Sequence, residues 1–173
     1  MTRNDILLIG VGRMPAEIRD WLNQGLLKAF GLRCRFGRSL PHPSFAWNAH
    51  RQQYLADAVL NCVDPEGSAC ALAAADMDLY VSRLNFVFGL ADQENRRAII
   101  ALPRLRQTYY RLPDDINLCE QRVLKEAIHE VGHVFGLHHC DDRRCVMTFS
   151  NSLADTDLKS YDFCSRCRRQ LHR

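Results

Sequence analysis

Long hydrophobic runs are absent from this sequence of 173 residues. The apolar run near the N-terminus covers only residues 6–11, whereas a secretory signal needs a longer apolar region followed by small residues. A membrane-spanning helix would need roughly 18 apolar residues in succession, and no segment approaches that length. We therefore expect a cytoplasmic protein with no membrane partner.

A strong charge of either sign is also lacking. The sequence has 23 Lys and Arg residues against 20 Asp and Glu residues, a net charge of +3. So small an excess does not favour a nucleic acid as partner. With 47% hydrophobic and 25% charged residues, the composition is that of a globular protein, and the length fits one domain over residues 1–173. We expect that domain to be a monomer.

Hydrophobic periodicity predicts a mixed α/β chain. The expected strands are residues 5–12, 32–36 and 98–105, and residues 76–89 are expected to form one strand or a strand pair. The expected helices are residues 15–31, 48–62, 117–136 and 157–171. Because Pro103 has no N–H to donate to a ladder, the strand at 98–105 is expected at the edge of the sheet.

Histidines are concentrated in residues 129–140, HEVGHVFGLHHC. In a helix, His129 and His133 are one turn apart, so both imidazoles project from the same face, with Glu130 beside them. This HExxH arrangement supplies two nitrogen ligands and a carboxylate that can hold a metal-bound water. Gly136 permits the positive φ that ends a helix, and the turn can bring His139 back as a third ligand. Three protein ligands leave one position open, which is typical of a catalytic zinc.

Accidental histidines on a surface helix are the alternative interpretation of this motif. The metal site is favoured because the motif lies on an amphipathic helix that is expected to stop at Gly136.

The eight cysteines divide into two groups. Four are scattered and are expected to be small buried hydrophobic residues: Cys34, Cys62, Cys70 and Cys119. The other four form C-x4-C followed by C-x2-C, a set suited to a closed tetrahedral zinc: Cys140, Cys145, Cys164 and Cys167. Two disulfides, with three possible connectivities, are one alternative, and a zinc ribbon that binds nucleic acid is another. The expected reducing compartment favours the metal over the disulfides.

The histidine motif followed by a methionine resembles the metzincin metallopeptidases. Combined with the cysteine pattern, HExxHxxGxxHC-x4-CxM followed by CxxC resembles the archaemetzincin family specifically, over residues 126–167. Outside the cysteines, the matching residues are His129, Glu130, His133, Gly136, His139 and Met147. The spacing between Met147 and Cys164 is one residue shorter than the family pattern usually has.

This resemblance implies an α/β metzincin-like domain with a mixed twisted sheet, an antiparallel edge strand, an active-site helix, a Met-turn at Met147 and a C-terminal helix. It implies an N-terminal subdomain of about residues 1–136 and a C-terminal subdomain of about residues 137–173. It also implies two zinc ions per chain, one catalytic and one structural. In that clan the methionine forms an apolar floor under the zinc.

The expected reaction is hydrolysis of a peptide or protein of unknown identity, with Glu130 as the base for a zinc-bound water. The substrate is expected antiparallel to an edge strand, for which residues 98–105 are our candidate. A zinc hydrolase of another substrate class remains open. A non-catalytic interaction module is disfavoured, because a structural site needs neither Glu130 nor an open coordination position.

Overall fold

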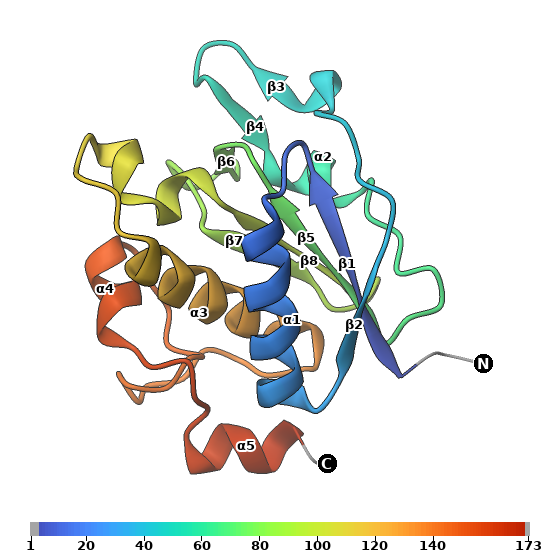
Figure 1. The fold of residues 1–173 in the computed structure, drawn as a ribbon, viewed down its shortest axis with the longest axis vertical. Helices are drawn as coiled ribbons and strands as arrows, with labels where there is room; N and C mark the ends of the chain where they lie inside the picture. The colour runs from blue at the N-terminus through green and yellow to red at the C-terminus, as the bar shows by residue number, and fades with distance from the viewer. Residues whose placement is uncertain (1–3, 172–173) are drawn as a thin grey trace.

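A five-stranded sheet forms the centre of the molecule, with the strand order β2-β1-β5-β8-β7 (Figure 1). The computed structural model describes residues 4–171. Four of the strands are parallel, and β7 pairs antiparallel with β8. The strands are β1 (Asp5–Val11), β2 (Arg33–Phe36), β5 (Cys70–Ala75), β7 (Gly89–Asp92) and β8 (Arg97–Ala101).

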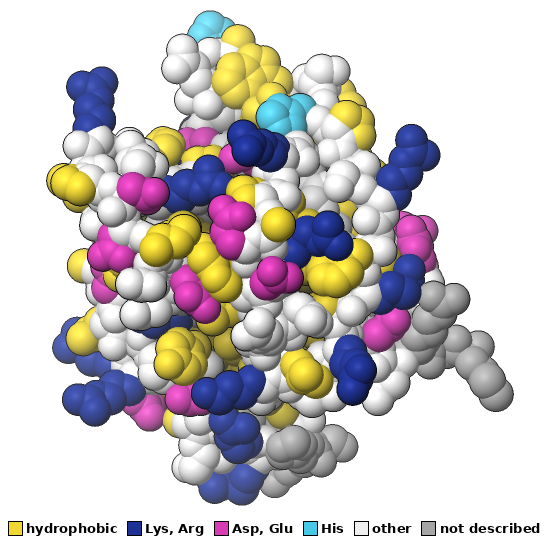
Figure 2. Space-filling model, viewed as in Figure 1, with side chains coloured by type: hydrophobic (Ala, Val, Ile, Leu, Met, Phe, Trp, Pro, Cys, Tyr) yellow, Lys and Arg dark blue, Asp and Glu magenta, His cyan; other side chains and the backbone are white. Residues whose placement is uncertain are grey.

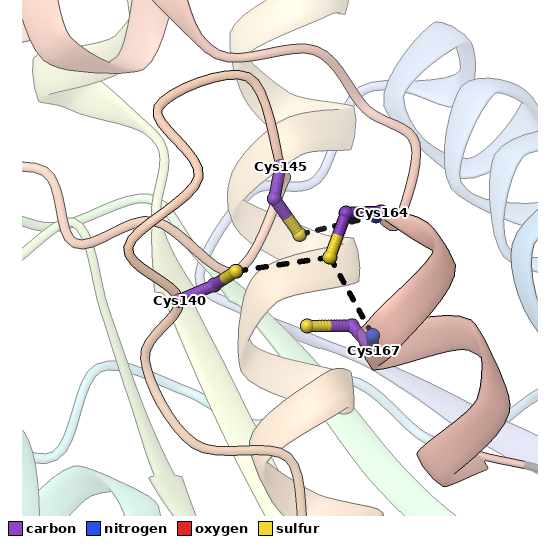
Figure 3. Close-up of side chains that lie close together, drawn as sticks. All are labelled: Cys140, Cys145, Cys164 and Cys167. Carbon is purple, nitrogen blue, oxygen red and sulfur yellow. Dashed lines mark hydrogen bonds between the residues drawn. The ribbon is translucent and has the colours of Figure 1, made fainter.

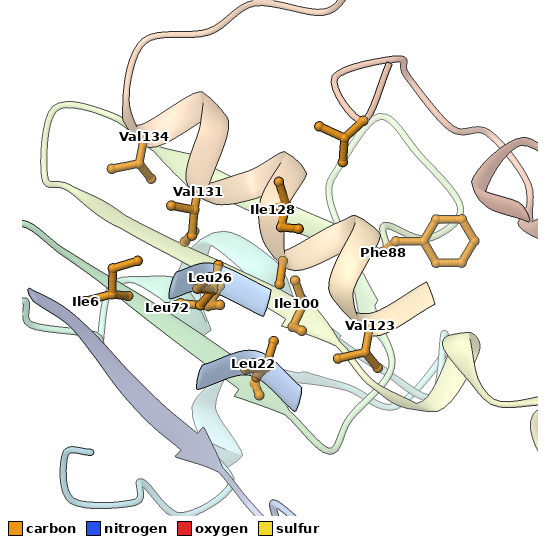
Figure 4. Close-up of a cluster of buried hydrophobic side chains, with 14 of the residues drawn as sticks. Ile6, Leu22, Leu26, Leu72, Phe88, Ile100, Val123, Ile128, Val131 and Val134 are labelled. Atoms are coloured by element: carbon orange, nitrogen blue, oxygen red, sulfur yellow. The ribbon is translucent and has the colours of Figure 1, made fainter. Parts of the chain in front are cut away.

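Two long helices lie side by side on one face of this sheet, α1 (Ala16–Phe30) and α3 (Ile116–Val134) (Figure 1). The predicted end of α1 is confirmed, because Gly31 has the left-handed φ of 70° and its N–H bonds to the carbonyl of Leu27. Figure 4 shows the apolar layer between these helices and the sheet. Its buried members include Leu22, Leu26, Val123, Val131, Leu72 and Ile100.

The opposite face of the sheet packs against a smaller layer that contains α2 (Ala56–Leu60). Successive residues of β1 alternate between the two cores: Ile6 and Leu8 face α1 and α3, whereas Leu7 and Ile9 face the layer of α2. A strand buried on both faces is apolar at every position, which is why residues 6–11 form an unbroken hydrophobic run.

The prediction of one helix over residues 48–62 is wrong. Only α2 is helical there, and a three-stranded sheet takes up β3 (Trp47–Asn48), β4 (Gln53–Leu55) and β6 (Leu79–Tyr80). The Asn48 side chain accepts bonds from the backbone N–H groups of His50 and Arg51, at 3.1 and 3.2 Å. Such an asparagine bond to its own following backbone stabilises a turn in place of a helix.

The strand or strand pair expected over residues 76–89 forms only in part. β6 lies in this segment, a single antiparallel bridge joins Leu79 to Val87, and β7 begins at Gly89. Between Leu79 and Val87 the backbone bonds to a side chain and not to a neighbouring strand: Arg51 donates to the carbonyls of Leu84 and Asn85.

The strand β5 was not predicted from the sequence. Its alanines carry little β propensity, and they form a strand because they are buried between β1 and β8.

The expectation that residues 98–105 lie at the sheet edge is wrong. The strand β8 is internal, between β5 and β7, and its ladder ends at Ala101. Pro103 lies beyond the strand, where it opens a short 3-10 helix, Pro103–Leu105, and its missing N–H costs no ladder bond. In the part of the chain that the structure describes, the sheet ends at β7, which has a strand on one side only.

The single helix expected over residues 157–171 is two short helices, α4 (Leu153–Leu158) and α5 (Ser165–Leu171). Ser152 and Asp155 form a capping box that starts α4. The helix stops where the backbone of Lys159 turns extended, with φ −71° and ψ 155°. The lysine side chain is thereby directed into the interior, where it is fully buried.

The surface carries no dominant charge on the face shown in Figure 2, where basic and acidic side chains are interspersed. This pattern agrees with the small net charge of the chain. Within residues 4–171, no helix has both the length and the apolar character needed to cross a membrane.

Candidate active site and metal centres

The helix α3 carries the histidine motif in its last turns. Asp115 caps its first turn by accepting a bond of 3.0 Å from the N–H of Leu118. The helix ends at Val134, and Gly136 follows with φ 87°, as its predicted role requires. His129 and His133 lie one turn apart with ring centroids 4.6 Å from each other.

The turn after α3 brings the third histidine back to the first two. The N–H of Leu137 bonds to the carbonyl of Gly132, which folds the chain back on the helix end. The ring of His139 lies 5.4 Å from that of His129 and 4.8 Å from that of His133. One ring nitrogen of each histidine lies within 4.8 Å of the others. The structure therefore brings together the three residues that the sequence predicted as ligands.

Hydrogen bonds determine which ring nitrogens face this point. Nδ1 of His129 donates to the carbonyl of Val146 at 2.8 Å, and Nδ1 of His133 donates to that of Leu137 at 2.7 Å. A carbonyl oxygen only accepts, so both Nδ1 atoms carry the proton. Burial lowers the pKa of His129 well below its ordinary value and also lowers the pKa of His133, which favours neutral rings.

In that tautomer the two Nε2 atoms carry bare lone pairs, and they face each other at 3.0 Å. Two lone pairs at this distance repel unless a cation lies between them. Neutral imidazoles whose other nitrogen is bonded to a carbonyl are the form in which histidine binds zinc. The donor set therefore fits a zinc ion held by His129, His133 and His139.

Glu130 is buried beside these histidines, with 6% of its surface exposed. A methyl group placed on Gly89 of β7 would lie 2.5 Å from Cγ of Glu130, so the carboxylate side chain lies directly against the start of the edge strand. Burial raises the pKa of Glu130 well above its ordinary value, the neighbouring Glu126 raises it further, and Lys159 acts in the opposite direction. A carboxylate with a raised pKa is suited to accepting a proton.

A cleft of about 530 Å³ opens above the histidines. Its lining includes Gly89, Leu90, Glu130, His133, His139 and Phe149. The ring of Phe149 lies 5.0 Å from that of His139 and is 46% exposed. The cleft therefore joins the edge strand, the histidine cluster and the segment after Met147.

Met147 packs beneath the histidine-bearing turn of α3. It is fully buried, and a methyl group on Gly132 would lie 2.6 Å from its sulfur. The absence of a side chain at Gly132 is what allows the methionine to approach the helix between His129 and His133. This location agrees with the apolar floor that the sequence resemblance implies.

The four late cysteines form a second cluster, in which their sulfur atoms all lie within 4.8 Å of one another (Figure 3). The sulfurs of Cys140 and Cys164 are 3.8 Å apart. A tetrahedron with zinc–sulfur bonds of about 2.3 Å has sulfur–sulfur edges of about 3.8 Å, so the spacing fits a four-thiolate zinc. None of the eight cysteines forms a disulfide in the structure. Of the four that were expected to be buried, Cys62 is exposed and Cys34 is half-buried, so the expectation is wrong for Cys62.

Backbone and side-chain donors point at these sulfurs. The N–H of Cys164 bonds to the sulfur of Cys145, and the N–H of Cys167 bonds to that of Cys164. The guanidinium of Arg166 donates to the sulfur of Cys140 at 3.2 Å. The N–H of Cys167 is the main cause that lowers the pKa of Cys164 to about 7, whereas burial raises the pKa of Cys145 and of Cys167. Cys164 is therefore the cysteine of this cluster that most readily forms the thiolate that binds metal.

Three features of the site were not found from the sequence. They are the location of the antiparallel edge strand at β7, the close approach of Gly89 to Glu130, and a buried ion pair between Glu126 and Lys159. The only sign of this ion pair in the sequence was the place of Glu126, which lies one helical turn before Glu130 on the same helix.

Comparison with known proteins places the chain in a family. The model of Peptidase family M54 matches residues 46–173. The archaemetzincin of Methanocaldococcus jannaschii is 40% identical over 161 residues, which cover 93% of this chain and 89% of that protein. The archaemetzincin crystal structure from Methanopyrus kandleri has a TM-score of 0.83 at 36% identity, over 98% of this chain and 97% of that one. A zinc-dependent peptidase from Methanocorpusculum labreanum has a TM-score of 0.87 at 28% identity, over 96% and 99% of the two chains.

The mixed sheet, the active-site helix and the three convergent histidines define a zinc-dependent metallopeptidase. The chain belongs to the archaemetzincin family, peptidase family M54. The fold class, the family and the peptidase activity expected from the sequence are thereby confirmed.

Proposed function

We propose that the chain hydrolyses peptide bonds at a zinc held by His129, His133 and His139, with Glu130 as general base. The observation that supports this most directly is the pair of Nε2 atoms at 3.0 Å, because two neutral imidazoles that donate from Nδ1 to carbonyls present these lone pairs to one shared cation. A zinc ion bound there supplies a Lewis acid that makes water more acidic and polarises the scissile carbonyl.

Glu130 accepts the proton of the attacking water and passes it to the leaving amine. Its burial supports this role, because exclusion of bulk water strengthens the proton affinity of the carboxylate. The contact with Gly89 limits where the carboxylate can move, which keeps it beside the histidine cluster.

The substrate main chain binds along β7, which replaces residues 98–105 as the proposed substrate strand. The free edge of β7 borders the cleft and starts at the residue that covers Glu130. Pairing with a strand edge uses main-chain bonds and therefore tolerates many sequences. Leu84 and Phe149, which are 43% and 46% exposed beside the cleft, supply apolar surface for substrate side chains.

A second, structural zinc is held by Cys140, Cys145, Cys164 and Cys167 in this proposal. Four thiolates close the coordination shell, so this ion has no open position for substrate. A thiolate site also needs reduced cysteines, which supports a cytoplasmic location.

The first test counts and removes the metal. We expect two zinc ions per chain by elemental analysis, and we expect a chelator to remove the histidine-bound ion first, since four thiolates hold the other. Cleavage of a peptide library should cease on chelation and return when zinc is added back. One zinc or none in carefully prepared protein, or disulfides among the four cysteines by mass spectrometry, would contradict the proposal.

The second test concerns the link between the two metal sites. Cys140 follows His139 directly, and its N–H bonds to the carbonyl of Met147 at 3.0 Å. Replacing Cys164 by Ser, which removes no histidine ligand, should release the thiolate-bound zinc, loosen this segment and weaken the histidine-bound zinc by about tenfold or more. Competitive chelation of wild type and variant measures the effect. Equal affinities in a variant that has lost its thiolate-bound zinc would show that the sites are independent.

A further inference from the structure

Lys159 is a fully buried lysine, with 0% of its side chain exposed. Its ammonium lies 3.0 Å from Oε1 of Glu126, whose side chain is 4% exposed, and donates to the carbonyl of Thr148 at 3.3 Å. The same Oε1 also accepts a bond of 3.2 Å from the hydroxyl of Thr156. Burying two opposite charges costs much of what their attraction returns, so fold stability alone is a weak explanation for this pair.

The two partners of Lys159 belong to the two halves of the histidine site. Glu126 lies on α3, one turn before Glu130, and borders the same cleft. Thr148 follows Met147 directly, and its hydroxyl lies within hydrogen-bond reach of the carbonyls of Cys140 and Asp142, both in the segment that follows His139. One ammonium group therefore connects the helix that bears two histidines to the segment that contacts the third.

The segment 146–149 touches each part of the site. The carbonyl of Val146 accepts the Nδ1 proton of His129. The sulfur of Met147 lies against α3 at Gly132. The ring of Phe149 packs on His139. A shift of this segment relative to α3 would move all three contacts at once.

We propose that Lys159 is a positioning residue of the histidine site, which holds segment 146–149 at a fixed distance from α3 by bonding Glu126 on one side and the carbonyl of Thr148 on the other. This proposal rests on the proposed function of the three histidines as zinc ligands. Its consequence is that the zinc affinity of the histidine site depends on Lys159, although the lysine touches no ligand.

A second ionic contact between the same elements offers a matched control. Arg122 of α3 donates to both carboxylate oxygens of Asp157 on α4, at 2.7 and 2.6 Å, and its side chain is 4% exposed. This pair fastens α4 to α3 without a bond to segment 146–149. Its loss should therefore lower stability and leave the histidine site intact.

The test compares three variants of the full chain with wild type: Lys159→Met, Arg122→Met and the double variant Glu126→Met/Lys159→Met. Zinc affinity of the histidine site is measured by competitive chelation, thermal unfolding by calorimetry, and ligand geometry by the absorption spectrum of cobalt bound in place of zinc. Content of the thiolate-bound zinc reports whether the C-terminal segment remains folded.

We expect Lys159→Met to weaken zinc binding at the histidines by about tenfold or more. It should also lower Tm, because it leaves the Glu126 carboxylate buried without a cationic partner. The double variant should recover Tm, since two apolar side chains replace the pair, yet it should bind zinc as weakly as the single variant and show an altered cobalt spectrum. Arg122→Met should lower Tm and keep the wild-type affinity.

Recovery of wild-type affinity in the double variant would overturn the proposal, because zinc binding would then follow stability alone. An equal loss of affinity in Arg122→Met would overturn it for the same reason. Wild-type protein that binds no zinc at the histidines would refute the proposed function itself, and this inference with it. That outcome is separate from the other two, since it appears before any variant is made.

Discussion

Replacing Glu130 by Ala is expected to lower peptide turnover by about 10²- to 10⁴-fold, with both zinc ions retained. Glu130 is not among the residues whose ligand atoms converge in either cluster, so its loss removes the proton acceptor and leaves the metal ligands in place. The measurement is a peptide-library digest analysed by mass spectrometry, in parallel with the zinc content of each protein.

Two further variants make this result specific. Glu130→Gln keeps the size of the side chain but has no carboxylate to accept a proton, and it should lose turnover to a similar extent. Gln121→Ala changes an exposed residue of the same helix and should cleave like wild type. Wild-type turnover in Glu130→Ala would show that the assigned mechanism is wrong, and loss of the histidine-bound zinc would indicate that Glu130 is needed for binding and not for proton transfer.

Replacing Gly89 by Ala is expected to lower turnover by about 10²-fold, the size of effect that a misplacement of roughly 1 Å produces at a reacting centre. The new methyl group would lie 2.5 Å from Cγ and 2.6 Å from Oε1 of Glu130. These atoms are buried, so the carboxylate has to leave its present position beside the histidine cluster to make room. Both zinc ions should remain bound.

A double-mutant comparison shows whether Glu130 is the cause. Gly89→Ala should lower Tm in the wild-type background, where two groups compete for the same space. In the Glu130→Ala background it should cost almost nothing, because an alanine side chain has no Cγ, and such non-additivity identifies residues in contact. An equal fall in Tm in both backgrounds would mean that the methyl group disturbs β7 itself. In that case the contact with Glu130 would not explain the lost turnover.

The active-site helix and both clusters could be predicted from the sequence because their determinants are local. His129 and His133 share a helix face through their spacing alone, and Gly136 permits the φ of 87° that ends the helix region. The cysteine spacing likewise indicated one set of four, and the structure brings their sulfurs together. The two candidate metal sites were thus encoded in residue types and short separations.

The choice of β7 as the proposed substrate strand depended on tertiary structure. The segment around β7, Gly-Leu-Ala-Asp, has low β propensity and is a strand only because β8 supplies a partner at the right place. Pro103 led to the wrong edge because its missing N–H was assigned to a ladder that in fact stops at Ala101. Sheet order is a property of long-range pairing, on which hydrophobic periodicity along the chain carries no information.

The sequence by itself determined the two clusters of candidate ligands, the helix that presents the histidines, and the family of the protein. Only the tertiary structure decided that β7 borders the cleft, that Gly89 leaves room for Glu130, and that Lys159 pairs with Glu126. The physical reason is distance along the chain: Glu126 and Lys159 meet through packing of α4 and the Met147 segment on α3. Local propensity specifies elements, whereas the cost of burying charge and the close packing of the interior select which of their side chains meet.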